Sequence, residues 1–349
     1  MNIKENLINT LSGIKTDIVP VISATQIGIS EGMEATETNW PEAHKNPEQM
    51  AKLGTSLYEL ASLECARIPF CLTVEAEAMG ATVELGNNER VPEVKESPFE
   101  NGEDIEVPDD FLENGRIPVV IEAIDIIKEE YPDLPLIVGV TGPFTLTGHL
   151  LGIENLVRLM KTDISEVETA LENSLDGCMD YIEEIVDHGA DVICIAEPSA
   201  SPELIDPIQF KTTIKPVLED LANFIECKKV LHICGSTQDI ITDMVSIGYD
   251  GISIEEGVDL IKAKEDIERL ESKTGACMID GYPHKSMVIG NISTSQTLFS
   301  GSIEDVKRDV KKALDDGVNI LAPSCGLAPK SPLKNIKTMV EERNEYYKN

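Results

Sequence analysis

Aromatic side chains, basic side chains and long apolar runs are all scarce in this sequence of 349 residues. Aromatic residues make up 4% of the chain, which argues against the stacking platforms that bind single-stranded nucleic acids. No apolar run approaches the ~20 residues that a membrane-spanning helix needs. Lysine and arginine together number 29 against 63 aspartates and glutamates, a formal net charge of −34. Because this charge repels DNA, RNA and anionic membranes, we expect neither a nucleic-acid nor a membrane partner.

Paired cysteine motifs are also missing. The eight cysteines are scattered along the chain without a CxxC pair, and the N-terminus lacks the charged-then-apolar pattern of a signal peptide. This distribution predicts a cytoplasmic protein whose cysteines are thiols or metal ligands rather than disulfides. Six cysteines are interpreted as small buried hydrophobic residues, namely Cys65, Cys71, Cys178, Cys194, Cys227 and Cys277.

Eight short, mostly apolar segments alternate with helical patterns along the chain. Such strands are buried on both faces, which is typical of a parallel sheet covered by helices. Eight of them predict an α/β fold of the (β/α)8 TIM-barrel type, with a doubly wound open sheet as the alternative. The predicted strands lie at residues 17–22, 68–72, 136–140, 191–196, 229–234, 251–254, 287–290 and 318–322.

The whole chain, residues 1–349, is expected to form a single domain, because it contains no internal repeat, low-complexity tract or Gly/Ser linker. Residues 75–118 are long for a barrel connection. They are interpreted as an excursion, an N-terminal elaboration that lies over the barrel mouth. Asn46, Pro47 and Glu48 predict the start of a helix, since they combine a capping side chain, a first-turn proline and an acid near the positive end of the helix dipole.

Polar residues follow most of the predicted strands. In a (β/α)8 barrel the active site lies at the carboxyl ends of the strands. We therefore expect these residues to converge on one mouth, and they are Glu75, Thr141, Glu197, His232 with Cys234, Glu255 with Glu256, Asn291 and Cys325.

Two of these strand ends carry soft metal ligands. His232 and Cys234 stand two positions apart, so on an extended strand they point to the same side. Cys325 lies at the end of another predicted strand, and its thiol can complete a metal site with His232 and Cys234 if the two strand ends lie together. One imidazole and two thiolates form a three-ligand zinc site with an open position, which is the catalytic rather than the structural pattern. Glu197 is a candidate fourth, displaceable ligand or an outer residue that orients the ligands.

Two thiolate ligands make zinc an electron-rich centre and a poor activator of water. They suit a site that accepts a third thiolate from a substrate. A zinc-bound thiol is deprotonated near neutral pH, whereas a free thiol has a pKa of about 8.5. The ligand set therefore favours zinc-dependent alkylation of a thiol.

The motif around these ligands resembles that of a known enzyme family. His232–Ile233–Cys234–Gly235, together with Cys325 in the segment 322–329, is similar to the zinc motif of methylcobamide:coenzyme M methyltransferases. The segments 142–146, 290–293, 46–53 and 40–44 resemble the wider uroporphyrinogen decarboxylase-like group, so the likeness covers nearly the whole chain. That group folds as a (β/α)8 barrel, in agreement with the strand count.

The resemblance implies a reaction. Coenzyme M binds zinc through its thiol, and the thiolate takes the methyl group from methyl-cob(III)amide on a small corrinoid protein, in methanogenesis from methanol or methylamines. Coenzyme M and the methylated corrinoid protein are thus the expected partners, with zinc as cofactor and the methylcobamide as co-substrate. Glu197 is the candidate catalytic residue, and four further residues are candidates for binding the cofactor or substrate: Glu75, Thr141, Asn291 and Lys330.

Lys330 is the candidate for holding the sulfonate of coenzyme M, together with backbone N–H groups near Pro332. Uroporphyrinogen decarboxylase activity itself is disfavoured, because the arginine-rich N-terminal motif is absent: the matching residues 21–26 read VISATQ. The stretch 275–285 is longer than the resemblance leads us to expect. Two alternatives stay open, a zinc methyltransferase with another thiol acceptor such as homocysteine, and a non-catalytic corrinoid-protein binding factor with a structural zinc.

Overall fold

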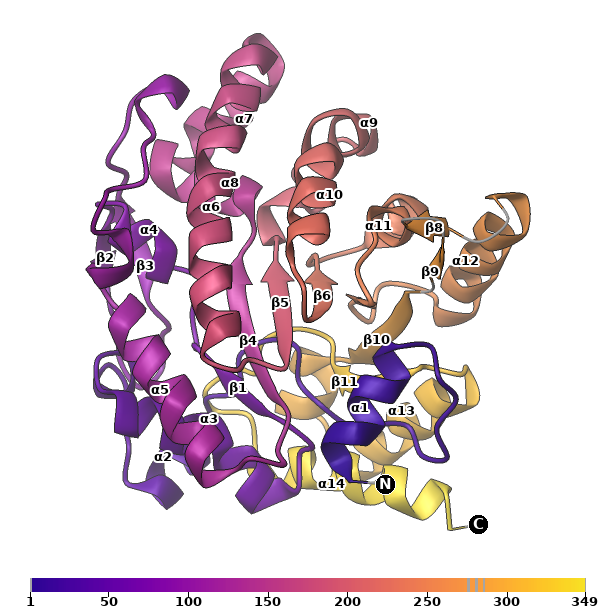
Figure 1. Cartoon of the computed structure of the whole chain (residues 1–349). Helices are drawn as coiled ribbons and strands as arrows, with labels where there is room; N and C mark the ends of the chain where they lie inside the picture. Colours follow the sequence, from indigo (N-terminus) through magenta and orange to yellow (C-terminus); the bar gives the residue numbers. More distant parts are fainter. Residues whose placement is uncertain (1, 275–276, 280–281, 285, 349) are drawn as a thin grey trace.

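A curled sheet of seven parallel strands forms the centre of the molecule (Figure 1). The computed structural model describes residues 2–274, 277–279, 282–284 and 286–348. The strand order is β1-β4-β5-β6-β7-β10-β11, so each strand lies beside its successor in the sheet as the chain advances. These strands are β1 (Ala66–Ile68), β4 (Leu136–Thr141), β5 (Val192–Ala196), β6 (Lys228–His232), β7 (Gly251–Ser253), β10 (Met287–Ile292) and β11 (Ile320–Pro323).

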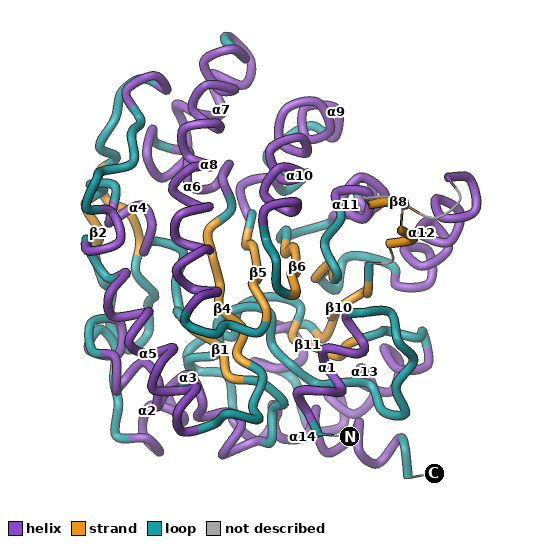
Figure 2. The backbone as a smooth tube through the Cα atoms, viewed as in Figure 1, coloured by secondary structure: helices purple, strands orange, loops and turns teal. Residues whose placement is uncertain are grey.

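Helices cover the outer face of this sheet, as Figure 2 shows by colour. Every residue of β4 and β5 is buried, as expected for strands packed on both faces. No helix among the described residues is both long and apolar enough to span a membrane. The helices are α1 (Ile3–Leu11), α2 (Ser30–Thr36), α3 (Pro47–Ala61), α4 (Val74–Ala78), α5 (Ile117–Glu130), α6 (Pro143–Leu151), α7 (Ile153–Thr162), α8 (Ile164–Asp187), α9 (Pro207–Gln209), α10 (Lys215–Phe224), α11 (Ile241–Ile247), α12 (Leu260–Thr274), α13 (Ile303–Asp315) and α14 (Leu333–Tyr346).

The predicted start of α3 is confirmed. The Asn46 side chain accepts a hydrogen bond from the backbone N–H of Gln49 at 2.8 Å, and Pro47 occupies the first turn, where its missing N–H costs nothing. The helix ends at Ala61, because Ser62 adopts a left-handed conformation with φ of 59°.

The predicted α/β class and its parallel sheet are confirmed, but the strand expected at residues 17–22 is not formed. Within that segment Val21 makes only an isolated parallel bridge to Leu321 of β11. Pro20 has no N–H to donate, and the Val21 N–H donates to the Glu64 side chain at 2.9 Å instead of to a neighbouring strand. The segment therefore lies beside β11 without continuing the ladder, and the structure shows a half-barrel of seven strands.

A buried ion pair holds this segment in place. The Arg343 guanidinium, on α14, donates to the Glu64 carboxylate and to the backbone carbonyl of Val19. Glu64 in turn accepts from Val21, so one carboxylate connects α14, the segment beside β11 and the loop that leads into β1. The side chain of Arg343 is only 2% exposed.

Two elements outside the sheet are the first helix, at the amino-terminal end of the strands, and the excursion of residues 75–118. Leu11 of α1 lies close to Gly251, the first residue of β7, so α1 covers the amino-terminal end of the sheet. The excursion carries a two-stranded hairpin, β2 (Thr82–Glu84) and β3 (Glu93–Glu96). The stretch 275–285 contains a second pair, β8 (Cys277–Ile279) and β9 (Tyr282–His284), and its remaining residues lie outside the described ones.

Arg343→Met is expected to lower the free energy of unfolding by up to about 3 kcal/mol, because it leaves Glu64, whose side chain is 15% exposed, without its cation. Urea denaturation followed by circular dichroism measures the change. The control is Arg308→Met, since the Arg308 side chain is 65% exposed beside Asp305, where water screens the ion pair, and its loss should leave stability nearly unchanged. Equal effects of the two substitutions would contradict the assigned role of the buried pair.

Candidate metal centre

The three residues proposed from the sequence as zinc ligands lie together at the carboxyl ends of two strands. His232 is the last residue of β6, Cys234 follows it by two positions, and Cys325 follows the end of β11 by two positions. The Cys234 sulfur lies 3.3 Å from His232 Nε2 and 3.6 Å from the Cys325 sulfur. The curl of the sheet thus joins residues that are 91 positions apart in the chain.

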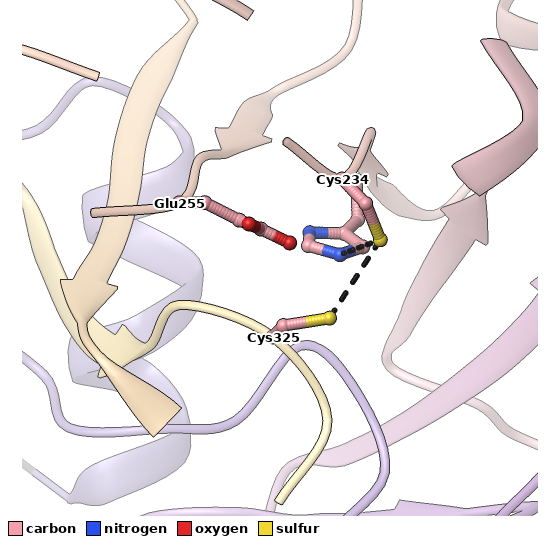
Figure 3. A group of neighbouring side chains, drawn as sticks. Cys234, Glu255 and Cys325 are labelled. Carbon is pink, nitrogen blue, oxygen red and sulfur yellow. Dashed lines mark hydrogen bonds between the residues drawn. The ribbon is translucent and has the colours of Figure 1, made fainter. Parts of the chain in front are cut away.

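Glu255 adds a fourth donor to this cluster. One donor atom from each of the four residues lies within 4.8 Å of the others. In Figure 3 the Glu255 carboxylate and the two sulfurs are directed toward one another. From the sequence, Glu197 was a candidate fourth ligand or orienting residue, and Glu255 was only one of the polar residues that follow a strand. An equal offset identifies Glu255: it lies two positions after the end of β7, as Cys234 and Cys325 do after β6 and β11.

The spacing of these donors fits a zinc ion. In a tetrahedral site with Zn–S bonds of about 2.3 Å and Zn–N bonds of about 2.0 Å, two sulfurs lie about 3.8 Å apart and a sulfur and a nitrogen about 3.5 Å apart. The observed separations of 3.6 and 3.3 Å are close to both. Imidazole, two thiolates and a carboxylate are all ligands that zinc accepts. The residues present therefore match the zinc site that the resemblance implies.

The electrostatics of the cluster also favour a cation. The hydrogen bond from Cys234 and the neighbouring His232 lower the pKa of the Cys325 thiol to about 4, although burial opposes this. The same hydrogen bond and burial raise the pKa of Cys234, since a second thiolate would form beside the first. Burial, with the charge of Cys325, raises the pKa of Glu255. A bound cation would allow all three groups to ionise together.

Ser253 orients the histidine of this centre. Its Oγ lies 3.0 Å from His232 Nδ1, and the two residues are in register on the adjacent strands β6 and β7. Both side chains are buried. With Nε2 facing the sulfurs, a metal on that nitrogen requires the ring proton on Nδ1, which then donates to Ser253. This contact selects the tautomer and fixes the plane of the imidazole.

A cavity of about 420 Å³ opens beside the centre, a size typical of small-molecule sites. Three of the four donors line it, and Glu255 does not. Apolar side chains form part of the wall, and hairpin residues 91–94 contribute another part. The excursion therefore reaches the cavity that contains the candidate ligands, which are His232, Cys234 and Cys325.

Comparison with known proteins gives the family. A family model described as uroporphyrinogen decarboxylase (URO-D) matches residues 2–346. The chain belongs to the uroporphyrinogen decarboxylase family. It is 41% identical to the methylcobamide:CoM methyltransferase MtaA of Methanosarcina barkeri, over 99% of this chain and 98% of the relative. It is 34% identical to the methylcobamide:CoM methyltransferase MtbA of Methanosarcina acetivorans, over 98% of each chain.

A solved structure agrees with these relatives. A methyltransferase from Methanosarcina mazei superimposes with a TM-score of 0.93 at 39% identity, covering 99% of both chains. The resemblance inferred from the sequence is therefore confirmed, and this member of the uroporphyrinogen decarboxylase family is a methyltransferase. That result sets aside the alternative of a non-catalytic binding factor.

The other residues singled out from the sequence lie around the centre rather than in it. Glu75 is buried and accepts hydrogen bonds from the Thr141 backbone N–H at 2.7 Å and hydroxyl at 2.8 Å. The Asn291 side-chain amide donates to the carbonyls of Glu255 and Val258, so it supports the loop that carries Glu255. None of Glu75, Thr141 and Asn291 is among the described residues that line the cavity.

Glu197 and Lys330 occupy different surroundings. Glu197 follows β5, and its buried carboxylate lies against the first turn of α6. Its two oxygens accept hydrogen bonds from the backbone N–H groups of Phe144 at 3.0 Å and Thr145 at 2.5 Å. Burial raises its pKa to about 7. The Lys330 side chain is 59% exposed and pairs with Glu89 of the excursion at 2.8 Å. Lys330 does not line the cavity, and its catalytic or binding role, like that of Glu197, stays a prediction.

We expect Cys325→Ala to lose most of its bound zinc, whereas Glu255→Ala keeps it, because an imidazole and two thiolates then remain. The loss of affinity in Cys325→Ala should exceed the roughly 10–100-fold drop typical of a lost outer partner. Metal analysis after dialysis and competition with a chelator measure both variants. The matched control is Cys227→Ala, a half-buried free thiol outside the cluster, which should keep its metal. Full zinc retention in Cys325→Ala would refute the ligand assignment.

Ser253→Ala should weaken zinc binding by about 10–100-fold without abolishing it, because the imidazole loses the partner that fixes its tautomer. Chelator competition gives the affinity. Ser286→Ala serves as the control, since Ser286 is a buried serine whose hydroxyl donates to the Tyr249 carbonyl, remote from the ligands. A comparable drop in both variants would assign the effect to general destabilisation.

Proposed function

We propose that this methyltransferase moves a methyl group from a methylcobamide on a corrinoid protein to the thiol of coenzyme M. Its cofactor is zinc, bound by His232, Cys234 and Cys325, and its setting is cytoplasmic methanogenesis from methanol or methylamines. One observation supports this most directly: a cluster of two cysteines, one histidine and one glutamate, within 4.8 Å, on a chain whose full-length relatives are named methylcobamide:CoM methyltransferases.

The ligand set suits a thiol rather than water as the fourth partner. Zinc supplies a deprotonated substrate sulfur at neutral pH, whereas the free thiol has a pKa of about 8.5. His232 and the two cysteines hold the metal from the cavity side, and Ser253 keeps the imidazole in the tautomer that leaves Nε2 free to bind. The thiol enters through the cavity that these three ligands line.

Glu255 is the donor that we expect to yield its place. Four permanent protein ligands would make a closed, structural zinc site. Its carboxylate is the only oxygen donor in the cluster, it is half-buried, and burial raises its pKa. These features make Glu255 the residue that would yield its place to a substrate thiolate if zinc were bound, and its carboxylate would then be free to hold the released proton.

The transfer step balances without an external oxidant. The thiol loses its proton, and the resulting thiolate attacks the methyl carbon, forming a sulfur–carbon bond. The cobalt–carbon bond breaks with its electron pair staying on cobalt, so methyl-cob(III)amide becomes cob(I)amide. The chain contributes orientation, since it holds the sulfur at the mouth where the corrinoid must arrive.

The excursion has a place in this proposal. We take residues 1–349 as one barrel domain, with residues 20–24 lying between β11 and β1 and with residues 75–118 over the mouth. Two contacts support that arrangement: Glu89 pairs with Lys330 beyond β11, and Asn88 accepts from the backbone N–H of Trp40 at 2.9 Å. A cavity of about 420 Å³ suits the small thiol, while the larger corrinoid is expected to dock at its entrance.

The test is anaerobic absorption spectroscopy of the zinc-loaded protein with free methylcobalamin and coenzyme M. We expect the cob(I)alamin spectrum to appear only when zinc and coenzyme M are both present, and not with Cys325→Ala. Demethylation with homocysteine but not with coenzyme M would establish the other thiol acceptor. Zinc-bound protein that reacts with neither thiol would defeat the proposal.

A further inference from the structure

Arg67 of β1 is a buried cation inside the cavity of the metal centre. Its side chain is 2% exposed, and among the described residues it forms no ion pair with a carboxylate. Of the described residues that line the cavity, it is the only arginine or lysine. Burying an unpaired charge is costly, and burial accordingly lowers the pKa of Arg67. No carboxylate among the described residues compensates this charge.

The guanidinium points toward the carboxyl ends of the strands. Arg67 is paired in register with Ile137, yet its Nη2 lies against Gly139, two residues further along β4. A Cβ at Gly139 would come within 2.0 Å of Nη2, so only glycine leaves room for the guanidinium there. The side chain thus extends from β1 toward the mouth, the end of the sheet at which the metal ligands lie.

Part of its hydrogen-bonding capacity is unused. Nε donates to the Ala24 carbonyl at 3.2 Å and Nη1 donates to the Pro69 carbonyl. Nη2 has no acceptor among the described residues. Thr25 also lines the cavity, is 7% exposed, and has a buried Oγ1 without a hydrogen-bond partner among them. A second polar group of the cavity wall therefore lacks a partner.

The other candidate cations are already paired. Arg116 donates to Glu77 at 2.5 Å, to the Cys71 sulfur at 3.2 Å and to the Thr73 hydroxyl at 2.7 Å, which uses its guanidinium in structural contacts. Lys330 pairs with Glu89 at the surface. These contacts leave Arg67 as the cation that is available to a ligand in the cavity.

We propose that Arg67, assisted by Thr25, binds the anionic end of the thiol substrate. The substrate class is a short thiol with a strongly acidic tail, which is the chemistry of coenzyme M, a mercaptoethanesulfonate. Arg67 grips the sulfonate while Cys234 and Cys325 lie near the thiol end, in the same cavity. The inference rests on the proposed function and names the residue that selects its thiol acceptor. A hydrogen bond between the guanidinium and an anionic group is strong in a buried site, and a thiol compound without an anionic group cannot form it.

The test compares two thiols of matched length, coenzyme M and the neutral 2-mercaptoethanol, with methylcobalamin as methyl donor. Arg67→Gln is expected to lower kcat/KM for coenzyme M by about 10- to 100-fold and to lower kcat/KM for 2-mercaptoethanol by a much smaller factor. Arg67→Lys should restore part of the preference, because it keeps the charge without the planar fork. Arg308→Gln, the same change of charge on the exposed face of α13, should change neither value. Equal losses with both thiols, or no loss, would overturn the assignment.

A second experiment uses the unmodified protein and covers the case that Arg67→Gln does not fold. Ethanesulfonate carries the anionic end without a thiol, so it should compete with coenzyme M and bind the zinc-free protein in calorimetry. Absence of binding would overturn the role of Arg67. This measurement needs no methyl transfer. If wild-type protein fails to demethylate methylcobalamin with any thiol tested but still binds ethanesulfonate, the proposed function is wrong and the anion site stands.

Discussion

The candidate metal centre depends on one constraint of parallel sheets, that the carboxyl ends of neighbouring strands meet at the same edge. Cys234, Glu255 and Cys325 each lie two positions after the last residue of a strand. Because these offsets are equal, their donor atoms lie at the same height above the carboxyl edge of the sheet. His232 is in register with Ser253 across β6 and β7, and the same pairing that builds the sheet orients the imidazole. Backbone hydrogen bonds thus set the positions of the ligands.

The interior holds charges that the protein does not neutralise by itself. The hydrogen bond to Cys325, with burial, raises the pKa of Cys234, and burial, with the charge of Cys325, raises the pKa of Glu255. Arg67 lies in the same cavity without a carboxylate partner among the described residues. In contrast, the buried cations with structural tasks, Arg116 and Arg343, are each paired with a glutamate. The paired arginines stabilise the fold, whereas Arg67 and the candidate metal ligands are the groups that we propose bind a ligand.

Side-chain contacts replace a regular strand between β11 and β1. Residues 17–22 do not continue the ladder, because Pro20 lacks a donor and Val21 bonds to Glu64. The side-chain pair of Glu64 and Arg343 replaces strand pairing at this point. Glu89, between the two strands of the excursion's hairpin, pairs with Lys330 beyond β11. Residues 91–94 of the same hairpin line the cavity.

The sequence alone was sufficient for the parallel α/β class, for six of the eight strands and for three residues of the candidate metal cluster. A seventh strand forms at Ala66–Ile68, overlapping the predicted 68–72 only at Ile68. Apolar strands alternating with helices are a local pattern, and the soft ligands stand beside the strand ends in the chain. Tertiary structure alone decided the rest. Glu255 rather than Glu197 joins the cluster because the hydrogen bonds at the start of α6 engage both oxygens of Glu197. In the sequence, nothing distinguishes Arg67 from other strand residues. Its lack of an acidic partner depends on which side chains the fold places around it.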